Sequence, residues 1–223
     1  MTSAGAGAWD LAHRRLYLCT PDRPDLEAFL DGCLSGGVDL VQLRDKTLEA
    51  GPLVARARLA KRVCAAHGVP CILNDRPDLA LEAGMDGVHV GQDDAPAGLA
   101  RRILGPDALL GLSTHAPAEL DAGVGEPVDY LSAGPVVPTP TKPGRAGTGL
   151  DYVTYAASRS PHPVFVTGGI TPETVPAVAR AGARHFVVVR HLVESDDPRR
   201  AASTLRGAID AALEAAGTEQ RVP

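Results

Sequence analysis

Short runs of apolar and β-branched residues alternate along the chain with longer runs rich in Ala, Leu and Arg. The first kind predicts eight strands, over residues 16–19, 38–44, 71–74, 87–90, 109–113, 129–134, 164–169 and 185–189. A predicted helix follows each strand, over residues 25–36, 49–67, 76–83, 96–104, 116–123, 150–159, 172–181 and 197–215. Strands that alternate with helices in this way indicate a parallel sheet.

The number of these units decides between the two common parallel architectures. Eight strand–helix units within roughly 200 residues fit a closed barrel better than an open, doubly wound sheet. The sequence therefore predicts an α/β fold with a single (β/α)8 TIM barrel over residues 15–216. Residues 1–14 are expected to form a disordered leader, and residues 217–223 a flexible tail. In such a barrel, the functional side chains stand at the carboxyl ends of the strands.

The second predicted strand carries polar residues where a barrel is normally apolar. Alternation places Val38, Leu40, Gln42 and Arg44 on one face, and Lys46 follows in the same phase. If this face points inward, Gln42, Arg44 and Lys46 need a polar partner. If the phase is the opposite one, the two cations are simply solvated.

Acidic side chains follow the third and fourth predicted strands. Asp75 comes directly after Asn74 at the end of the third strand, and Asp94 lies shortly beyond the fourth. Carboxylates from two neighbouring strands form a hard oxygen site, which suits Mg²⁺ completed by substrate phosphates. Each carboxylate taken alone could equally cap the helix that follows it.

A long loop follows the sixth predicted strand, over residues 134–149. Thr139, Thr141 and Lys142 on this loop are groups that bind anions, and Gly144, Gly147 and Gly149 would let it move. Its four prolines exclude a helix or a central strand. Since it is longer than most connections of its kind, it is interpreted as a functional loop or lid.

Polar residues or glycines also stand at the carboxyl ends of the fifth, seventh and eighth predicted strands. Ser113 and His115 follow the fifth strand, and Gly168 and Gly169 follow the seventh. Glycines there let backbone N–H groups approach a ligand, although a tight turn alone would also explain them. The loops after strands seven and eight often hold a phosphate in this fold. The rim thus offers two anion sites, which predicts two phosphorylated substrates or one substrate with phosphates at both ends.

Composition limits the partners. The hydrophobic fraction of 44% and the charged fraction of 22% are ordinary for a soluble globular protein. The net charge of −5 argues against nucleic acid or an anionic membrane as a partner. No apolar run approaches the roughly 20 residues that span a bilayer. The four cysteines lack metal-ligand spacing, which is typical of reduced thiols in a cytoplasmic protein.

Six short motifs give the chain a resemblance to a known family. They are "QLRDK", "NDRPDLA", "GVHVGQDD", "GLSTH", "GPVVPTPTKP" and "VTGGI", and they occur in the order of the thiamine phosphate synthase motifs. The resemblance runs from about Leu16 to Leu213. It implies a barrel enzyme, a transferase of thiamine biosynthesis. Such an enzyme joins 4-amino-5-hydroxymethyl-2-methylpyrimidine diphosphate to hydroxyethylthiazole phosphate and releases pyrophosphate.

The resemblance also implies a mechanism and a set of residues. The C–O bond to pyrophosphate would break first, and the thiazole nitrogen would capture the resulting pyrimidine carbocation. By resemblance, Mg²⁺ is expected on Asp75 and Asp94. Contacts to the pyrimidine diphosphate are expected from Gln42, Arg44, Lys46, Asn74, Ser113 and Lys142. Contacts to the thiazole phosphate are expected from Thr139, Thr141, Gly169, Val189 and Arg190.

Within this set, the residues expected to act in catalysis are Lys142, Arg44, Lys46 and Ser113. The chain departs from the family at Val189 and Arg190, where Ile-Ser is often found. If the contact uses backbone N–H groups, the exchange is harmless. If it uses the Ser hydroxyl, the second phosphate site is altered.

Two other functions fit parts of the pattern. A thiazole tautomerase of the same barrel family would use His115 as its acid or base and would not need a diphosphate–metal site. A non-catalytic binder of thiamine intermediates would have no reason to stabilise a departing pyrophosphate. The cations of the second strand together with Asp75 and Asp94 favour the synthase. The sequence leaves open a homo-oligomer, a carboxylated thiazole substrate and the role of the leader.

Overall fold

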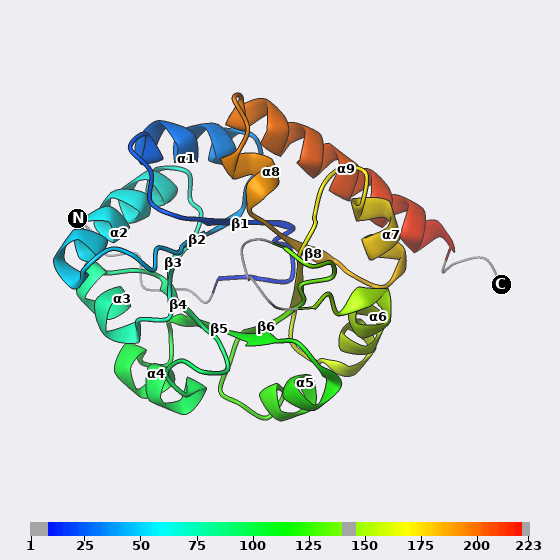
Figure 1. Cartoon of the computed structure of the whole chain (residues 1–223), viewed down its shortest axis with the longest axis horizontal. Helices are drawn as coiled ribbons and strands as arrows, with labels where there is room; N and C mark the ends of the chain where they lie inside the picture. The colour runs from blue at the N-terminus through cyan, green and yellow to red at the C-terminus, as the bar shows by residue number, and fades with distance from the viewer. Residues whose placement is uncertain (1–8, 140–145, 220–223) are drawn as a thin grey trace.

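The chain folds into a closed barrel of parallel strands (Figure 1). The structure is a computed structural model that describes residues 9–139 and 146–219. In chain order the strands are β1 (Leu16–Thr20), β2 (Leu40–Leu43), β3 (Cys71–Asn74), β4 (Gly87–Val90), β5 (Leu109–Thr114), β6 (Tyr130–Ala133), β7 (Val164–Thr167) and β8 (His185–Val188). Each strand pairs with its sequence neighbours, and β8 closes the barrel on β1. The predicted (β/α)8 TIM barrel is therefore confirmed.

Helices surround the barrel. They are α1 (Leu26–Ser35), α2 (Ala50–Ala66), α3 (Pro77–Ala83), α4 (Ala97–Leu104), α5 (Pro117–Gly123), α6 (Gly149–Arg159), α7 (Val175–Arg180), α8 (Arg190–Val193) and α9 (Pro198–Glu219). The short α8 is not among the predicted helices. It lies inside the outer ring, between β8 and the long α9 (Figure 1). Its four residues are too few to show a helical period in the sequence.

Both ends of the described chain differ from the predicted domain boundaries. The prediction of a disordered leader is wrong for residues 9–14, because Leu11 is buried in the cluster that fills the barrel interior. Apolar side chains such as Leu11 cover the open end of the barrel interior, and sequence periodicity does not reveal which residues do so. The expected tail beyond 216 is also wrong at its start, since α9 continues to Glu219. Residues 1–8 and 220–223 lie outside the described residues.

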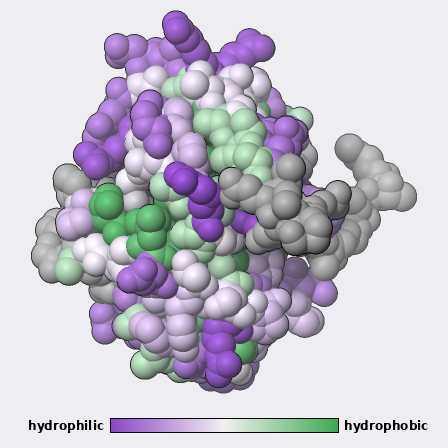
Figure 2. All heavy atoms as spheres, turned by 90° about the vertical axis from the view of Figure 1, so that its right-hand side faces the viewer, coloured by the Kyte–Doolittle hydropathy of each residue, from purple (hydrophilic) through white to green (hydrophobic). Residues whose placement is uncertain are grey.

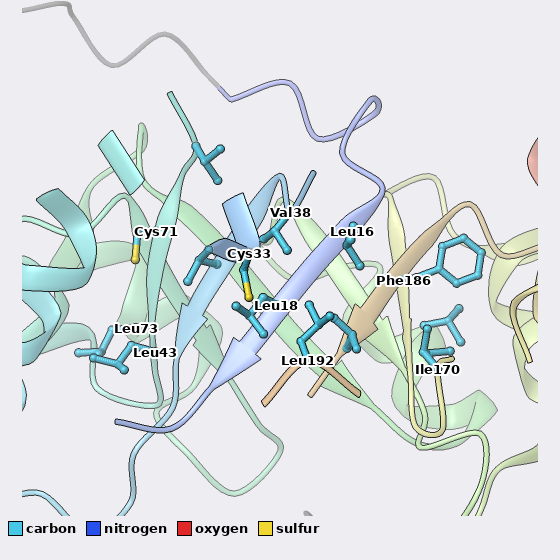
Figure 3. Packing of buried hydrophobic residues seen from close by; sticks show 14 of the residues in the cluster. Leu16, Leu18, Cys33, Val38, Leu43, Cys71, Leu73, Ile170, Phe186 and Leu192 are labelled. Carbon is cyan, nitrogen blue, oxygen red and sulfur yellow. The ribbon is translucent and has the colours of Figure 1, made fainter. Parts of the chain in front are cut away.

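Alternation along the strands divides the core into two layers. On β1, Leu16 and Leu18 face the helices, whereas Tyr17 and Cys19 face the barrel interior. Figure 3 shows part of the outer layer around β1, β8 and α8. The outer layer holds the helices on the barrel, and the inner layer fills the barrel itself.

The phase predicted for the second strand is confirmed inside β2. Leu40 belongs to the inner layer, and Gln42 is buried beside Tyr17 and Cys19. The prediction is wrong for Val38, which packs in the outer layer. Val38 precedes the first residue of β2, so strand alternation does not apply to it.

The barrel interior changes from apolar to polar toward the carboxyl ends of the strands. Its lower part is filled by large side chains: Tyr17, Leu40, Ile72, Leu109, Tyr130 and Phe165. Nearer the carboxyl ends come buried polar side chains: Gln42, Asn74, His89, Ser113 and Ser132. Because buried polar groups require hydrogen-bond partners, this upper layer is suited to hold a polar ligand.

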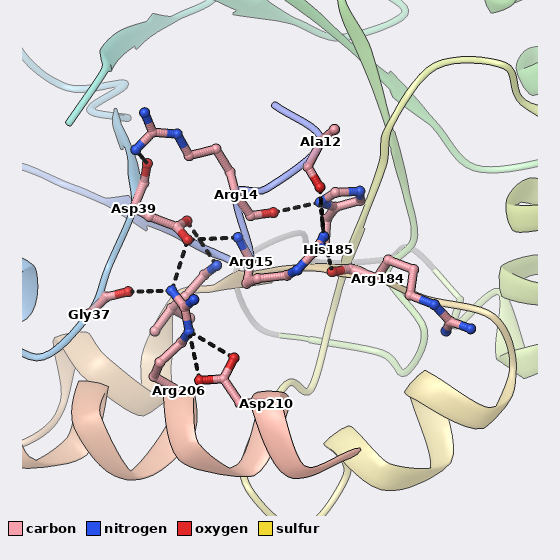
Figure 4. A network of polar contacts seen from close by, with 10 residues as sticks. Ala12, Arg14, Arg15, Gly37, Asp39, Arg184, His185, Arg206 and Asp210 are labelled. Carbon is pink, nitrogen blue, oxygen red and sulfur yellow. Dashed lines mark hydrogen bonds and ion pairs between the residues drawn. The ribbon is translucent and has the colours of Figure 1, made fainter. Parts of the chain in front are cut away.

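Three aspartates fasten the opposite end of the barrel. They directly precede β2, β4 and β6 and are, respectively, Asp39, Asp86 and Asp129. Each accepts a hydrogen bond from a backbone N–H of the strand before it, namely β1, β3 and β5. Each also pairs with a cation from an outer helix, respectively Arg206, Lys61 and Arg101. Figure 4 shows the network around Asp39, which joins β1, β2 and α9. These contacts hold strands and helices together away from the polar end.

The outer surface is mixed in character. On the face in Figure 2, hydrophilic residues predominate and hydrophobic residues gather in limited areas. The large hydrophobic side chains that are exposed, Leu81, Leu99, Val137 and Leu150, belong to different elements. Among the described helices, none is both long enough and apolar enough to cross a bilayer.

Replacing Asp86 by alanine should destabilise the barrel. Asp86→Ala is expected to lower the free energy of unfolding by about 2 kcal/mol, since the buried Cys71 N–H and the Lys61 ammonium both lose a partner. Chemical denaturation followed by circular dichroism measures the loss. The control is Asp107→Ala in the exposed loop before β5, which is expected to stay within about 0.5 kcal/mol of wild type. Equally small losses of unfolding free energy for both substitutions would contradict the role of Asp86 in holding strands and helices together.

Candidate functional site

A cavity of about 520 Å³ opens at the carboxyl ends of the strands. It is lined by these predicted site residues: Gln42, Arg44, Lys46, Asn74, Asp75, Asp94, Ser113, Thr139, Gly169, Val189 and Arg190. Residues from β2 to β8 and their loops thus meet at one mouth, although they are far apart in the chain. The predictions for Thr141 and Lys142 lie outside the described residues.

The cations after β2 stand on the wall of this cavity. Arg44 is half-buried, and its backbone N–H donates to the Thr20 carbonyl at 2.8 Å, which continues the pairing of β1 and β2. Lys46 is exposed, and its Nζ lies 2.9 Å from Oδ2 of Asp75. The predicted inward phase therefore brings both cations to the cavity wall, where the exposed Lys46 is held by its ion pair with Asp75.

Asp75 and Asp94 form a carboxylate pair beside Lys46. Asp75 adopts a left-handed φ of 63°, and its N–H donates to the His89 carbonyl at 2.8 Å. Burial, together with the neighbouring Asp94 carboxylate, raises the pKa of Asp75 above its usual range. Against the effect of burial, hydrogen bonds with Asp75 and the Gly91 N–H lower the pKa of Asp94. The two carboxyl groups therefore influence each other's ionisation, and a cation between them would favour the ionised forms.

The helix-capping alternative is not supported for either carboxylate. Neither α3 nor α4 has a side-chain hydrogen bond at its N-cap. Asp94 instead accepts a hydrogen bond from the Gly91 N–H at 2.9 Å, within the loop that precedes α4. The side chains are thus held for the cavity and not for the helix ends.

The donor set suits a hard divalent cation. Among the described residues, no group of three or more acidic, His or Cys side chains forms a complete metal cage. Two carboxylates with an ammonium beside them are the arrangement expected where Mg²⁺ keeps water ligands and binds substrate phosphates.

Hydrogen bonds across the cavity floor were missed by the sequence reasoning. Ser113 Oγ lies 2.9 Å from Nε2 of His89, and Nδ1 of His89 lies 2.9 Å from the hydroxyl of Tyr130. The signal in the sequence is the inward phase of Tyr17 on β1 and Tyr130 on β6. Strand periodicity predicts strands at Tyr17 and Tyr130 but not the contact between their hydroxyl groups.

The loops after β7 and β8 form the other end of the cavity. Gly168 and Gly169 have positive φ values of 99° and 75°, and a Cβ on either residue would overlap the loop after β6. Val189 and Arg190 stand where α8 begins. The neighbouring His191 was also missed, and its Nε2 is buried without a hydrogen-bond partner among the described residues. Two glycines and two basic side chains thus meet at this end.

The base of the loop over residues 134–149 is fixed to the barrel. The Val136 N–H donates to the Thr167 carbonyl at 2.8 Å, and the Gly149 N–H donates to the Val136 carbonyl at 3.0 Å. Thr139 extends from this base to the cavity wall. Gly147 packs against Val136 at the same base. The predicted mobility stays a prediction, and Gly144 lies outside the described residues.

Solved structures with similar folds include one whose description matches the predicted family. Thiamine phosphate pyrophosphorylase from Pyrococcus furiosus superposes with a TM-score of 0.83 and 26% identity, covering 90% of this chain and 97% of that one. A 3-hexulose-6-phosphate synthase from Salmonella typhimurium superposes with a TM-score of 0.65 and 18% identity, covering 91% and 99%. The second likeness shows the fold alone.

The sequence comparisons agree with one another. The family model for thiamine monophosphate synthase matches residues 16–192. Thiamine-phosphate synthase from Mycobacterium tuberculosis (strain CDC 1551 / Oshkosh) is 49% identical over 218 residues, which cover 91% of this chain and 97% of the relative. The Acidothermus cellulolyticus enzyme of the same name is 46% identical over 207 residues, covering 91% and 98%. The chain therefore belongs to the thiamine monophosphate synthase family.

Proposed function

We propose that the chain is a transferase that joins 4-amino-5-hydroxymethyl-2-methylpyrimidine diphosphate to hydroxyethylthiazole phosphate. The products would be thiamine phosphate and pyrophosphate. The observation that carries this proposal is a single cavity with a cation–carboxylate cluster at one end and a glycine-rich basic turn at the other. Family membership supports the same activity.

The end beside β2, β3 and β4 is suited to the diphosphate. Arg44 and Lys46 supply positive charge, and a diphosphate that binds Lys46 would release Asp75 from its ion pair. Asp75 and Asp94 would then hold Mg²⁺, which neutralises phosphate charge and stabilises a leaving pyrophosphate when bound. Gln42 and Asn74, buried on the floor, would fix the pyrimidine end of the substrate, and the buried Ser113 would contact an oxygen of its diphosphate.

The end beside β7 and β8 is suited to the thiazole phosphate. Gly169 and the backbone at Val189 bring N–H groups to the cavity, as phosphate sites in this fold commonly do. Arg190 and His191 would add side-chain contacts, while Thr139 and Thr141 would close the site from the loop. In this arrangement, backbone groups replace the Ser hydroxyl that the family often has at position 190.

The reaction that fits the site begins with bond cleavage. The C–O bond to pyrophosphate breaks, and its electron pair leaves with the pyrophosphate. The thiazole nitrogen then donates its lone pair to the pyrimidine carbocation and forms the new C–N bond. Charge grows on the departing oxygen, so cations fixed at that position lower the barrier more than a general base would.

The other functions receive less support. A tautomerase has no use for the cation–carboxylate cluster, and His115 Nδ1–H here donates to the Gly134 carbonyl at 2.5 Å.

The described cysteines are all buried free thiols, which fits an enzyme of a reducing compartment such as the cytoplasm. The assembly state is left open by the single chain.

Mixing the purified protein with both substrates and Mg²⁺ tests the activity. Thiamine phosphate and pyrophosphate should form in equal amounts, as measured by chromatography and a coupled phosphate assay. Isomerisation of the thiazole without coupling would instead identify the tautomerase. Binding of both compounds without turnover would identify the non-catalytic binder.

The metal assignment predicts a dependence on Mg²⁺. Asp75→Asn should raise the Mg²⁺ concentration required for half-maximal rate, because one carboxylate ligand is lost. Titrating Mg²⁺ at saturating substrates measures this shift, with the exposed Asp107→Asn as the control. Full activity of the wild type in excess chelator would refute the assignment.

Lys142 is expected to act on the leaving group. Lys142→Ala should lower kcat by about 100-fold or more and change KM far less, because its attraction to pyrophosphate grows in the transition state. Steady-state kinetics measures both values. Arg102→Ala, on the exposed side of α4, provides the control for loss of a cation. An unchanged kcat for Lys142→Ala would remove the residue from this role.

A further inference from the structure

A continuous chain of hydrogen bonds crosses the floor of the cavity. It joins β1, β2, β4, β5 and β6 through Cys19, Gln42, Tyr17, Tyr130, His89 and Ser113. We propose that this relay fixes the direction in which the Ser113 hydroxyl points its hydrogen, so that Ser113 donates to the substrate. The inference rests on the proposed function only in naming that acceptor as an oxygen of the pyrimidine diphosphate.

Each link of the relay is a direct contact. Cys19 Sγ donates to Oε1 of Gln42 at 3.2 Å, and Nε2 of Gln42 donates to the Tyr17 hydroxyl. The Tyr17 and Tyr130 hydroxyls lie 3.1 Å apart. Two contacts of 2.9 Å then lead from Tyr130 through His89 to Ser113. Ser113 at the end of the relay lines the cavity, as do Cys19, Gln42, Tyr17 and His89 along it.

Burial makes the relay directional. Each of the six side chains is at most 7% exposed. Burial raises the pKa of both tyrosines far above the usual range, so each stays a neutral phenol with one hydrogen to donate. A neutral hydroxyl that accepts from one neighbour and donates to the other passes the same direction along the chain.

The orientation of the Gln42 amide sets that direction. Since Nε2 of Gln42 donates to Tyr17, the Tyr17 hydroxyl donates to Tyr130. In a neutral His89, Tyr130 then donates to Nδ1, and the hydrogen of the imidazole is on Nε2. His89 in turn donates to Ser113, whose own hydrogen is left to point into the cavity.

The reverse orientation would have the opposite consequence. If the Gln42 amide turned over, every hydrogen would point the other way, and Ser113 would donate to His89. The serine would then present only lone pairs to an anionic phosphate oxygen, which would repel it. The Cys19 thiol opposes this turn, because its S–H is held by the amide oxygen and sulfur accepts hydrogen bonds weakly.

The barrel is shaped to make room for the central link. A Cβ on Gly111 of β5 would overlap both the Tyr130 ring and Nδ1 of His89. The two rings stack with centroids 5.5 Å apart and planes 26° apart. A glycine at the inward position 111 thus permits the contact through which the relay passes.

A double-mutant cycle tests the relay through kinetics. Tyr130→Phe keeps the ring and removes the hydroxyl, so kcat should fall by about tenfold with little change in KM. In a Ser113→Ala background, the same substitution should cause no further loss, because the relay acts through that hydroxyl. Tyr17→Phe breaks the relay one link earlier and should behave alike. Independent, multiplying losses would show a purely structural role and overturn the proposal.

The matched control is another buried tyrosine. The Tyr152 hydroxyl donates to Thr114 Oγ1 at 2.7 Å, in the outer layer and outside the relay. Tyr152→Phe should therefore leave kcat close to that of wild type. A loss as large as that of Tyr130→Phe would show that any missing buried hydroxyl slows the enzyme, which also overturns the proposal.

The tautomer of His89 tests the relay without turnover. In ¹⁵N-labelled protein free of substrate, long-range ¹H–¹⁵N correlation spectra should show His89 with its hydrogen on Nε2, and a His89→Gln variant assigns the signals. Tyr130→Phe should weaken this preference, while Tyr152→Phe should retain it. A wild-type hydrogen on Nδ1 would overturn the proposed direction. Because no reaction is required, the result stands apart from the activity assay.

Discussion

The alternation of side chains along eight parallel strands is the constraint on which the rest of this molecule depends. Every second residue must enter the barrel, so the chain has to fill a closed interior with side chains that suit each depth. Large apolar and aromatic groups fill the lower part, and buried polar groups follow two positions later. The same alternation that puts Leu40 in the core puts Gln42 beneath the cavity. Packing and function are thus set by one pattern.

The two ends of the barrel use charge in different ways. At the amino end, Asp39, Asp86 and Asp129 accept backbone hydrogen bonds and pair with cations from the helices, so their charges are satisfied within the fold. At the carboxyl end, Asp75 pairs with Lys46, and burial together with the neighbouring Asp94 carboxylate raises its pKa. Charges that are paired within the fold stabilise it, whereas two neighbouring carboxylates are suited to bind a cation. This contrast separates the structural end of the barrel from the functional one.

The sequence predicted the barrel, its strands and most of the cavity wall, because strand periodicity and the polar residues at strand ends are local signals. Arg44, Asp75 and Gly169 could be assigned in this way. It missed α8, the burial of Leu11 and the Tyr17–Tyr130–His89 contacts. These features depend on which strands meet after closure: Tyr17 and Tyr130 are 113 positions apart, and no local pattern records their contact. Val38 shows that even a local prediction of which face a residue occupies fails outside the strand, since side-chain alternation ends where strand pairing ends.

In the proposed function, one cavity binds two anions at opposite ends, with the leaving group beside β2, β3 and β4. The most direct measurement is a crystal structure of the protein with thiamine phosphate, pyrophosphate and Mg²⁺. The account predicts pyrophosphate against Arg44 and Lys46, metal density next to Asp75 and Asp94, and the thiamine phosphate group at Gly169 and Val189. Pyrophosphate at the β7–β8 end, or metal away from both carboxylates, would contradict the account.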